Sequence, residues 1–151
     1  MNRDCAHCIN YKKVVIIGCG FVGAASAFSL MESGLFSEMV LIDSDRAKAE
    51  GEALDISHGL PFAKPMEIYA GDYKDINDAS LIIITAGVNQ KNGETRLDLV
   101  KRNVNIFKNI IFEINNQNYK GLILVVANPV DILTTVVAKL SNLPETNVIG
   151  S

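Results

Sequence analysis

The sequence predicts an α/β fold in which a doubly wound, parallel, six-stranded sheet carries helices on both faces. Short runs of β-branched and aliphatic residues alternate with segments of helical spacing along the chain. One run, LIIITA at residues 81–86, is almost wholly apolar, as expected of a strand buried on both faces of a parallel sheet. With 151 residues, 48% of them hydrophobic, the chain can bury the core of one domain.

The first strand and helix are separated by a glycine turn. The run KVVIIG at residues 13–18 is β-branched and ends in glycine. Helical spacing then continues over residues 20–33, until Gly34 provides a stop. A second strand is expected at residues 39–43, and it ends in an acidic residue, Asp43.

A second helix and two more strands follow. Ser44 is the expected N-cap of a helix that runs towards His58 and Gly59. Residues 66–70 form the third expected strand and residues 81–86 the fourth. Strand and helix therefore alternate, as parallel pairing requires.

The fourth strand leads into a polar, glycine-containing loop, GVNQKNGETR at residues 87–96. A long helix is expected after it, because apolar residues recur at helical spacing. These residues are Leu97, Val100, Val104, Phe107 and Ile111. The pattern predicts a mobile loop joined to a rigid helix.

The last part of the chain completes the second half of the sheet. GLILVV at residues 121–126 is the fifth expected strand. NPVD then opens a helix that continues to about Leu140, with Pro129 in its first turn. Residues 148–150 give the sixth strand, so two β-α-β-α-β halves are predicted within residues 13–151.

Charge and hydropathy limit the class of partner. The formal net charge of −3 and the dispersed lysines disfavour a nucleic acid or an anionic membrane. The sequence lacks an apolar run long enough to span a bilayer, and its first residues are polar where a signal peptide is apolar. We therefore expect a cytoplasmic protein with a small-molecule or protein partner.

Residues 1–12 are expected to form a flexible tail. Cys5 and Cys8 flank His7 with the spacing of a redox or zinc motif, but the sequence holds no second cysteine pair to complete a zinc site. Cys19 lies within the glycine turn, and three cysteines cannot all pair in one chain, which fits a reducing compartment. No metal site is expected.

Residues 18–23, GCGFVG, form a GxGxxG pattern between a strand and a helix. Gly18 permits the sharp turn, Gly20 lets the backbone approach a pyrophosphate, and Gly23 allows close packing of helix on strand. Asp43 follows twenty residues after Gly23 at the end of the next strand, where a carboxylate binds both adenosine ribose hydroxyls. The same charge repels a ribose 2′-phosphate, so NAD is favoured over NADP.

A Rossmann domain that binds another nucleotide or S-adenosylmethionine remains an alternative on this motif alone. The segment AGVNQKNGETRLDLV at residues 86–100, however, closely resembles the active-site loop of L-lactate dehydrogenases. GCGFVG, Asp43, LDISHG (residues 54–59), VVANPVD (residues 125–131) and the final VIGS add to the resemblance, which extends from about Lys13 to Ser151.

The resemblance implies roles for the loop. Arg96 would close over the substrate as the catalytic residue that polarises its keto group. Gln90 would lie beside the methyl end of pyruvate, where the related malate dehydrogenases carry an arginine for a second carboxylate. Asn128 would bind the substrate and orient the nicotinamide, unless its amide only caps the following helix, and Asp131 would lie in the same substrate site.

The same resemblance assigns further residues to the NAD site. They follow the glycine turn and the carboxyl ends of the strands, as expected for a ligand at that edge. The expected cofactor-binding residues are Gly18, Gly20, Phe21, Val22, Gly23, Asp43, Lys48, Tyr73, Ala86, Gly87, Val88, Asn109, Val126, Asn128 and Ser151. For His58 a structural role at a helix end is expected, because a donor there opposes the helix dipole.

In the family, the proton-donating histidine, its aspartate and the arginine that holds the substrate carboxylate belong to a following substrate domain. We therefore expect this chain to be the NAD-binding part of an L-lactate dehydrogenase, inactive alone, from a family that forms homotetramers and reduces pyruvate to lactate in fermentation. A malate dehydrogenase fragment, a non-catalytic NAD(H)-binding module and a non-functional remnant remain alternatives.

Overall fold

The computed structural model describes residues 10–90 and 92–151, and its fold class is the predicted one. Neighbouring strands are all parallel, in the order β3-β2-β1-β4-β5-β6. The strands are β1 (Asn10–Ile17), β2 (Glu38–Ile42), β3 (Glu67–Ala70), β4 (Ala79–Ile84), β5 (Leu122–Val125) and β6 (Val148–Gly150). The helices are α1 (Phe21–Ser33), α2 (Arg46–Ser57), α3 (Arg96–Asn116) and α4 (Val130–Leu140). Three short 3₁₀ turns are η1 (Leu60–Phe62), η2 (Tyr73–Ile76) and η3 (Glu145–Asn147).

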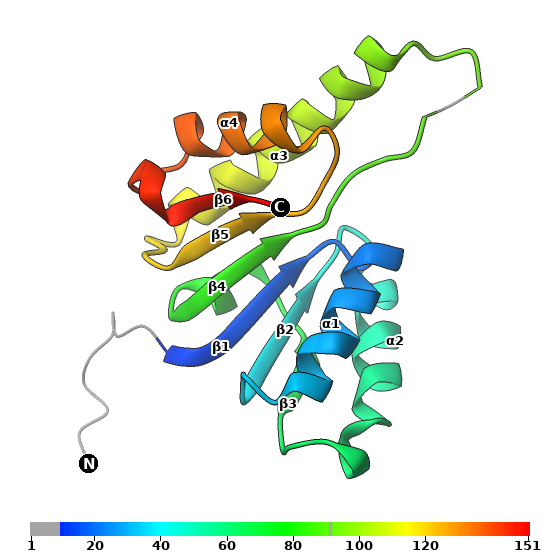
Figure 1. Ribbon diagram of the computed structural model, residues 1–151, viewed down its shortest axis with the longest axis vertical. Helices are drawn as coiled ribbons and strands as arrows, with labels where there is room; N and C mark the ends of the chain where they lie inside the picture. Colours follow the sequence, from blue (N-terminus) through cyan, green and yellow to red (C-terminus); the bar gives the residue numbers. More distant parts are fainter. Residues whose placement is uncertain (1–9, 91) are drawn as a thin grey trace.

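The helices lie on both faces of the sheet (Figure 1), with α1 and α2 on one face and α3 and α4 on the other. The alternation of side chains along β1 explains this arrangement. Val14 and Ile16 are fully buried against the first pair of helices, whereas Val15 packs with the second pair. β1 is therefore apolar on both faces and lies in the centre of the sheet.

The strand order reverses between β1 and β4. The chain builds outward from β1 to β3, then returns to the other side of β1 and builds outward again to β6. Loops after β1 and β4 consequently leave the sheet in opposite directions, which opens a crevice at the carboxyl ends of these two strands. A ligand site is expected there.

The first strand begins earlier than predicted. β1 starts at Asn10, which pairs with Ala79 of β4 after a register shift, so residues 10–12 do not belong to the predicted tail. The ammonium of Lys13 lies 2.8 Å from Asp78 and 3.2 Å from Glu38, and this pairing explains how a lysine is buried in β1. Residues 1–9, with Cys5, His7 and Cys8, lie outside the described residues.

Two predicted helix starts were wrong. The N-cap of α2 is Asp45, whose carboxylate accepts from the backbone N–H of Lys48, because the Ser44 hydroxyl instead donates to Asp43. Pro129 is the N-cap of α4 and not a residue of its first turn. Apart from the start of β1, the predicted ends of the strands differ from the observed ends by at most two residues, because the local sequence pattern does not determine them.

The long helix α3 starts at a capping box. The Thr95 hydroxyl accepts from the backbone N–H of Asp98, and the Asp98 carboxylate accepts from the backbone N–H of Thr95. Leu97 is 63% exposed, so the predicted apolar stripe begins one turn later than its spacing indicated. Asn103, which lies on the buried face, is 97% buried, at 3% exposure.

Every helix within residues 10–90 and 92–151 is too short or too polar to cross a bilayer.

Candidate functional site

The glycine turn between β1 and α1 requires glycine at two of its three glycine positions. Gly18 has a φ of 107°, in the left-handed region that favours glycine, and a Cβ there would meet the backbone of Ala86, two residues after β4. A Cβ on Gly23 would run into the Gly18 carbonyl and lie 2.9 Å from the Thr85 hydroxyl. The first glycine thus permits the turn, and the last permits close packing of α1 on the sheet.

Gly20 differs from both. Its Cβ position has no atom within 4 Å, so open space lies directly above the backbone at the N-cap of α1. The N-cap position has no side-chain hydrogen bond, and the first backbone N–H groups of a helix have no partner within the helix. An anion that sits close to the backbone fits here, because glycine removes the side chain and the helix dipole favours negative charge.

Asp43 lies directly after β2 and accepts hydrogen bonds from the adjoining turns. Its Oδ2 accepts from the backbone N–H of Cys19 at 2.7 Å, and its Oδ1 accepts from the backbone N–H of Asp45 at 3.0 Å. Burial raises the pKa of this carboxyl, but the two N–H donors, together with the Lys48 charge and the Ser44 hydroxyl, outweigh burial and leave the pKa below its ordinary value. Asp43 is therefore ionised at neutral pH.

The carboxylate keeps the capacity to bind further donors. Each carboxylate offers about four lone-pair sites. Asp43 uses two for backbone N–H groups, and a third is taken at 3.3 Å by the Ser44 hydroxyl, which is free to rotate away. Two hydroxyl groups of a ligand therefore fit the remaining capacity of Asp43.

A groove of about 520 Å³ connects the glycine turn to Asp43 and continues between β4 and α3. Nine of the predicted cofactor residues line it. They are Gly18, Gly20, Asp43, Lys48, Tyr73, Ala86, Gly87, Val88 and Asn109. Burial, with smaller contributions from Glu113 and Asp43, raises the pKa of Tyr73 to about 12, so its phenol is neutral.

Sequence reasoning missed most of the helical wall of this groove. Ile106, Ile110 and Glu113 line it together with Asn109. Their spacing of three and four residues places them on one face of α3. Helical periodicity, counted from the predicted residue Asn109, could therefore have identified the other three. Ile17, Ile42, Ser44 and Thr85, at the strand ends, were also missed.

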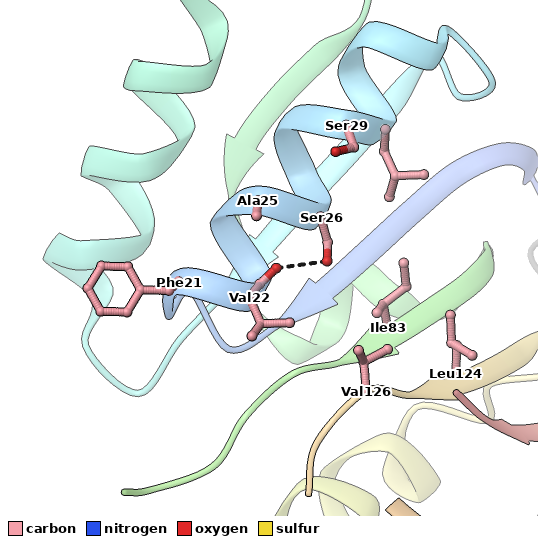
Figure 2. Close-up of a pocket in the computed structure, with 9 residues that line it drawn as sticks. Phe21, Val22, Ala25, Ser26, Ser29, Ile83, Leu124 and Val126 are labelled. Carbon is pink, nitrogen blue, oxygen red and sulfur yellow. Dashed lines mark hydrogen bonds between the residues drawn. The ribbon is translucent and has the colours of Figure 1, made fainter.

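Three predicted cofactor residues line a different groove. Phe21, Val22 and Val126 lie with Ile83 and Leu124 around a depression of about 600 Å³ on the α1 face of β4 and β5 (Figure 2). Phe21 is 99% exposed and points away from the other side chains. Gly23 is buried beneath the turn and does not line the main groove.

The loop between β4 and α3 extends away from the sheet (Figure 1). The Gln90 side-chain amide donates to the Glu94 carbonyl at 2.6 Å, and Arg102 donates to both Glu94 carboxylate oxygens, at 2.8 and 2.9 Å. Arg96 is exposed and is the first residue of α3. Among the described loop residues, the groove lining ends at Val88, so the structure does not bring Gln90 or Arg96 into the groove.

Three more predicted site residues, Asn128, Asp131 and Ser151, lie in the segments that follow β5 and β6. Asn128 is exposed in the turn after β5, and α4 has no side-chain cap bond, so the capping alternative for Asn128 was wrong. Asp131 and Ser151 line a third depression, of about 640 Å³, between α4 and the end of β6. These residues follow adjacent strands but do not share the groove of Asp43.

The side chains of Cys19 and His58 do not line this groove. Burial, followed by the nearby carboxylates of Asp43 and Glu52, raises the pKa of the Cys19 thiol to about 11, and the thiol donates to the Ile42 carbonyl at 3.8 Å. His58 is exposed at the C-terminal end of α2, where its backbone N–H bonds the last carbonyls. Within residues 10–90 and 92–151, no group of three His, Cys, Asp or Glu side chains is arranged to hold a metal ion.

Comparison with known proteins matches residues 12–150 to the model of the lactate/malate dehydrogenase NAD-binding domain. The chain is 59% identical over 140 residues to an L-lactate dehydrogenase of Acetivibrio thermocellus and to one of Priestia megaterium, covering 93% of this chain and 44% of each relative. A lactate dehydrogenase from a deep-sea metagenome superposes with a TM-score of 0.89 at 51% identity, over 92% of this chain and 45% of that one. A ligand-bound minor L-lactate dehydrogenase of Enterococcus mundtii gives 0.90 at 46% identity, with the same coverage. The chain thus spans less than half the length of these relatives.

Proposed function

The chain belongs to the lactate/malate dehydrogenase family, within its NAD-binding domain, and we propose that it forms the cofactor half of an NAD-dependent L-lactate dehydrogenase. The observation that carries this proposal is the ionised Asp43 beside the open backbone of Gly20. Ribose hydroxyls and a pyrophosphate are the groups that such a pair binds. When bound, NADH would supply the hydride.

The chain's own residues account for the choice of cofactor. The backbone at Gly20 and the N-terminus of α1 hold the pyrophosphate, because no side chain blocks the approach. Asp43 binds the adenosine ribose and repels a 2′-phosphate, which selects NAD over NADP. The apolar side chains of Ile106 and Ile110 cover the adenosine half of the groove, with the neutral phenol of Tyr73.

The loop residues account for the substrate. Arg96, at the start of α3, moves over the carboxyl ends of the strands, polarises the keto oxygen and excludes water. Gln90 lies beside the methyl group of pyruvate and carries no charge to pair with a second carboxylate, so a monocarboxylic keto acid is favoured over a dicarboxylic one. Asn128 and Asp131 orient the substrate from the turn after β5.

Reduction of a keto acid also needs a proton on oxygen. Among the described residues, the one histidine is His58, and it lies at the far end of α2 from Asp43, about 18 Å along a helix of 12 residues. We therefore expect the 151 residues alone to bind NADH and to turn over pyruvate negligibly. Assembly as a homotetramer, cytoplasmic location and a role in fermentation belong to the proposal.

Titration with NADH tests the cofactor site. Energy transfer from tyrosine to the bound reduced nicotinamide reports binding, since the chain has no tryptophan. Asp43→Ala should abolish saturable binding, whereas Asp55→Ala, which removes an exposed carboxylate of α2, should leave it unchanged. Equal binding by the two variants would contradict the assignment of the ribose site to Asp43.

A chimera tests the substrate. The matching 44% of the Acetivibrio thermocellus enzyme is replaced by this chain, and rates are measured with pyruvate and with oxaloacetate. We expect pyruvate to be preferred, Arg96→Ala to lower kcat/KM by about 10²- to 10³-fold, and Gln90→Arg to shift preference towards oxaloacetate. A folded, NADH-binding chimera that prefers oxaloacetate would favour malate dehydrogenase.

Size measurement tests the assembly. The described surface includes fully apolar side chains at high exposure, with Phe21 at 99% and Phe62 at 95%. In the proposed assembly, another domain or subunit covers these side chains. Light scattering of the chimera should give a tetramer, and a monomer at micromolar concentration would contradict this part of the proposal.

A further inference from the structure

Asn103 is a buried amide that the proposed chemistry does not use. It lies in the second turn of α3, with only 3% of its surface exposed. Its Oδ1 accepts from the backbone N–H of Val88 at 2.9 Å, and its Nδ2 donates to the backbone carbonyl of Asn128 at 3.4 Å. One side chain therefore connects the segment after β4 with the segment after β5.

The two connected segments belong to the second half of the sheet. Asp43 marks the adenosine half, because it follows β2. A dinucleotide crosses the carboxyl ends of both halves of a doubly wound sheet, so its second nucleotide lies over β4, β5 and β6. Val88 follows β4 and lines the groove, and Asn128 follows β5.

The β4 and β5 ladder does not reach these two segments. The pairing of β4 with β5 ends at Ile84 and Val125, after which a single backbone bond joins Val126 to Ile84. Beyond it, the Asn103 amide spans the gap between Val88 and Asn128. A Cβ on Gly87 would lie 3.6 Å from Asn103 Oδ1, so the loop backbone passes directly over this amide.

We propose that Asn103 is a positioning residue for the nicotinamide half of the dinucleotide: it sets the separation of the segments after β4 and β5 and leaves the adenosine half unaffected. The assignment rests on the proposed function. Only a side chain with both an acceptor and a donor can bind an N–H on one side and a carbonyl on the other. Isosteric leucine fills the space and makes neither bond.

Two ligands separate the halves of the site. ADP-ribose contains the adenosine and pyrophosphate without nicotinamide, whereas NADH contains both. Calorimetric titration of the full 151-residue chain gives both dissociation constants. In Asn103→Leu we expect the NADH constant to rise about 3- to 10-fold, as for the loss of one or two hydrogen bonds, while the ADP-ribose constant changes less than about twofold.

A matched control lies on the same helix. Asn115 donates to the Leu140 carbonyl and accepts from the Asn142 N–H, so it also binds one backbone carbonyl and one backbone N–H, but both belong to a single segment at the end of α4, remote from the groove. Asn115→Leu should lower the unfolding temperature without changing the ratio of the two constants. Asn103→Ser provides a second variant. The serine side chain is too short to bind both backbone groups, and it places no large apolar side chain in the buried site.

Hydrogen exchange provides a measurement that needs no ligand. The amide of Val88 should lose protection in Asn103→Leu and Asn103→Ser, but not in Asn115→Leu. Parallel weakening of NADH and ADP-ribose, or unchanged affinities with an unprotected Val88 amide, would overturn the assignment. If the wild-type chain bound neither ligand, the proposed function itself would fail, and the positioning role with it.

Discussion

The Asp43 carboxylate accepts a hydrogen bond from the backbone N–H of Cys19, across 2.7 Å between the end of β2 and the glycine turn. The two groups lie 24 residues apart in the sequence. A charge placed for ribose recognition therefore also fixes the turn that would receive the pyrophosphate. Substitution of Asp43 should consequently affect both parts of the cofactor site.

Asp43→Asn should reduce discrimination between NADH and NADPH. The amide keeps one oxygen that can accept from Cys19, but it removes the negative charge that opposes a 2′-phosphate. Two like charges at about 4 Å repel by about 1 kcal/mol in water, so the ratio of the NADPH and NADH dissociation constants should fall about 5- to 10-fold. Titration of both coenzymes measures it, and an unchanged ratio would show that Asp43 does not face the ribose.

The pair formed by Glu94 and Arg102 should hold the loop against α3. The Glu94 side chain is 11% exposed and that of Arg102 34%. In a double-mutant cycle with Glu94→Gln and Arg102→Met, we expect a coupling of about 1 kcal/mol in the free energy of unfolding by urea. Additive effects of the two substitutions would indicate that solvent screens the pair.

Lys13 should contribute stability that persists to high pH. Burial lowers its pKa, but Asp78 and Glu38 outweigh burial and raise it above 10.5. The contribution is thus complete below the unfolded pKa and is lost as the pH rises through the folded value. Lys13→Met should cost about 2 kcal/mol at pH 7 to 10, less than for a fully buried pair because Asp78 is 41% exposed.

Urea unfolding of wild type and Lys13→Met at several pH values measures this contribution. Lys74→Met is the control, because that lysine is 74% exposed and its bond to Asp72 is 3.4 Å long. The control should change stability by less than about 0.5 kcal/mol. A wild-type advantage that vanished between pH 7 and 9 would be inconsistent with a raised pKa of Lys13.

The Cys19 thiol should be inert in the folded chain. It is 2% exposed, and its pKa of about 11 leaves little thiolate at pH 8. In a Cys5→Ser, Cys8→Ser background, a disulfide reagent should label no cysteine within minutes at pH 8, and one cysteine after addition of urea. Rapid labelling without urea would mean that the glycine turn opens readily.

The order of the elements was predictable because strands buried on both faces contain continuous apolar runs. LIIITA predicted a central strand, and β4 pairs with both β1 and β5. The first and last residues of elements were less predictable, because they depend on contacts between distant parts of the chain. β1 extends to Asn10 because Ala79 offers a partner, and no local pattern contains that information.

The site was predictable where a residue type is required by geometry. The glycines at 18 and 23 and the carboxylate at 43 belong to this group. The wall of the groove on α3 was not predictable. In the sequence, Ile106 and Ile110 are indistinguishable from ordinary core residues, and only the position of the helix beside β4 shows that they line the groove. Asn103 was missed for the opposite reason, because a polar residue on an apolar face gave no indication of its two backbone partners.

The position of α3 has a consequence for the order of events during translation. The ribosome makes β1, α1 and β2 first, so the glycine turn and Asp43 emerge together. The helical wall contributed by residues 106–113 follows more than sixty residues after Asp43. A nascent chain can therefore carry the polar recognition groups well before it can enclose a nucleotide, and cofactor binding becomes available only after residues 106–113 have emerged from the ribosome.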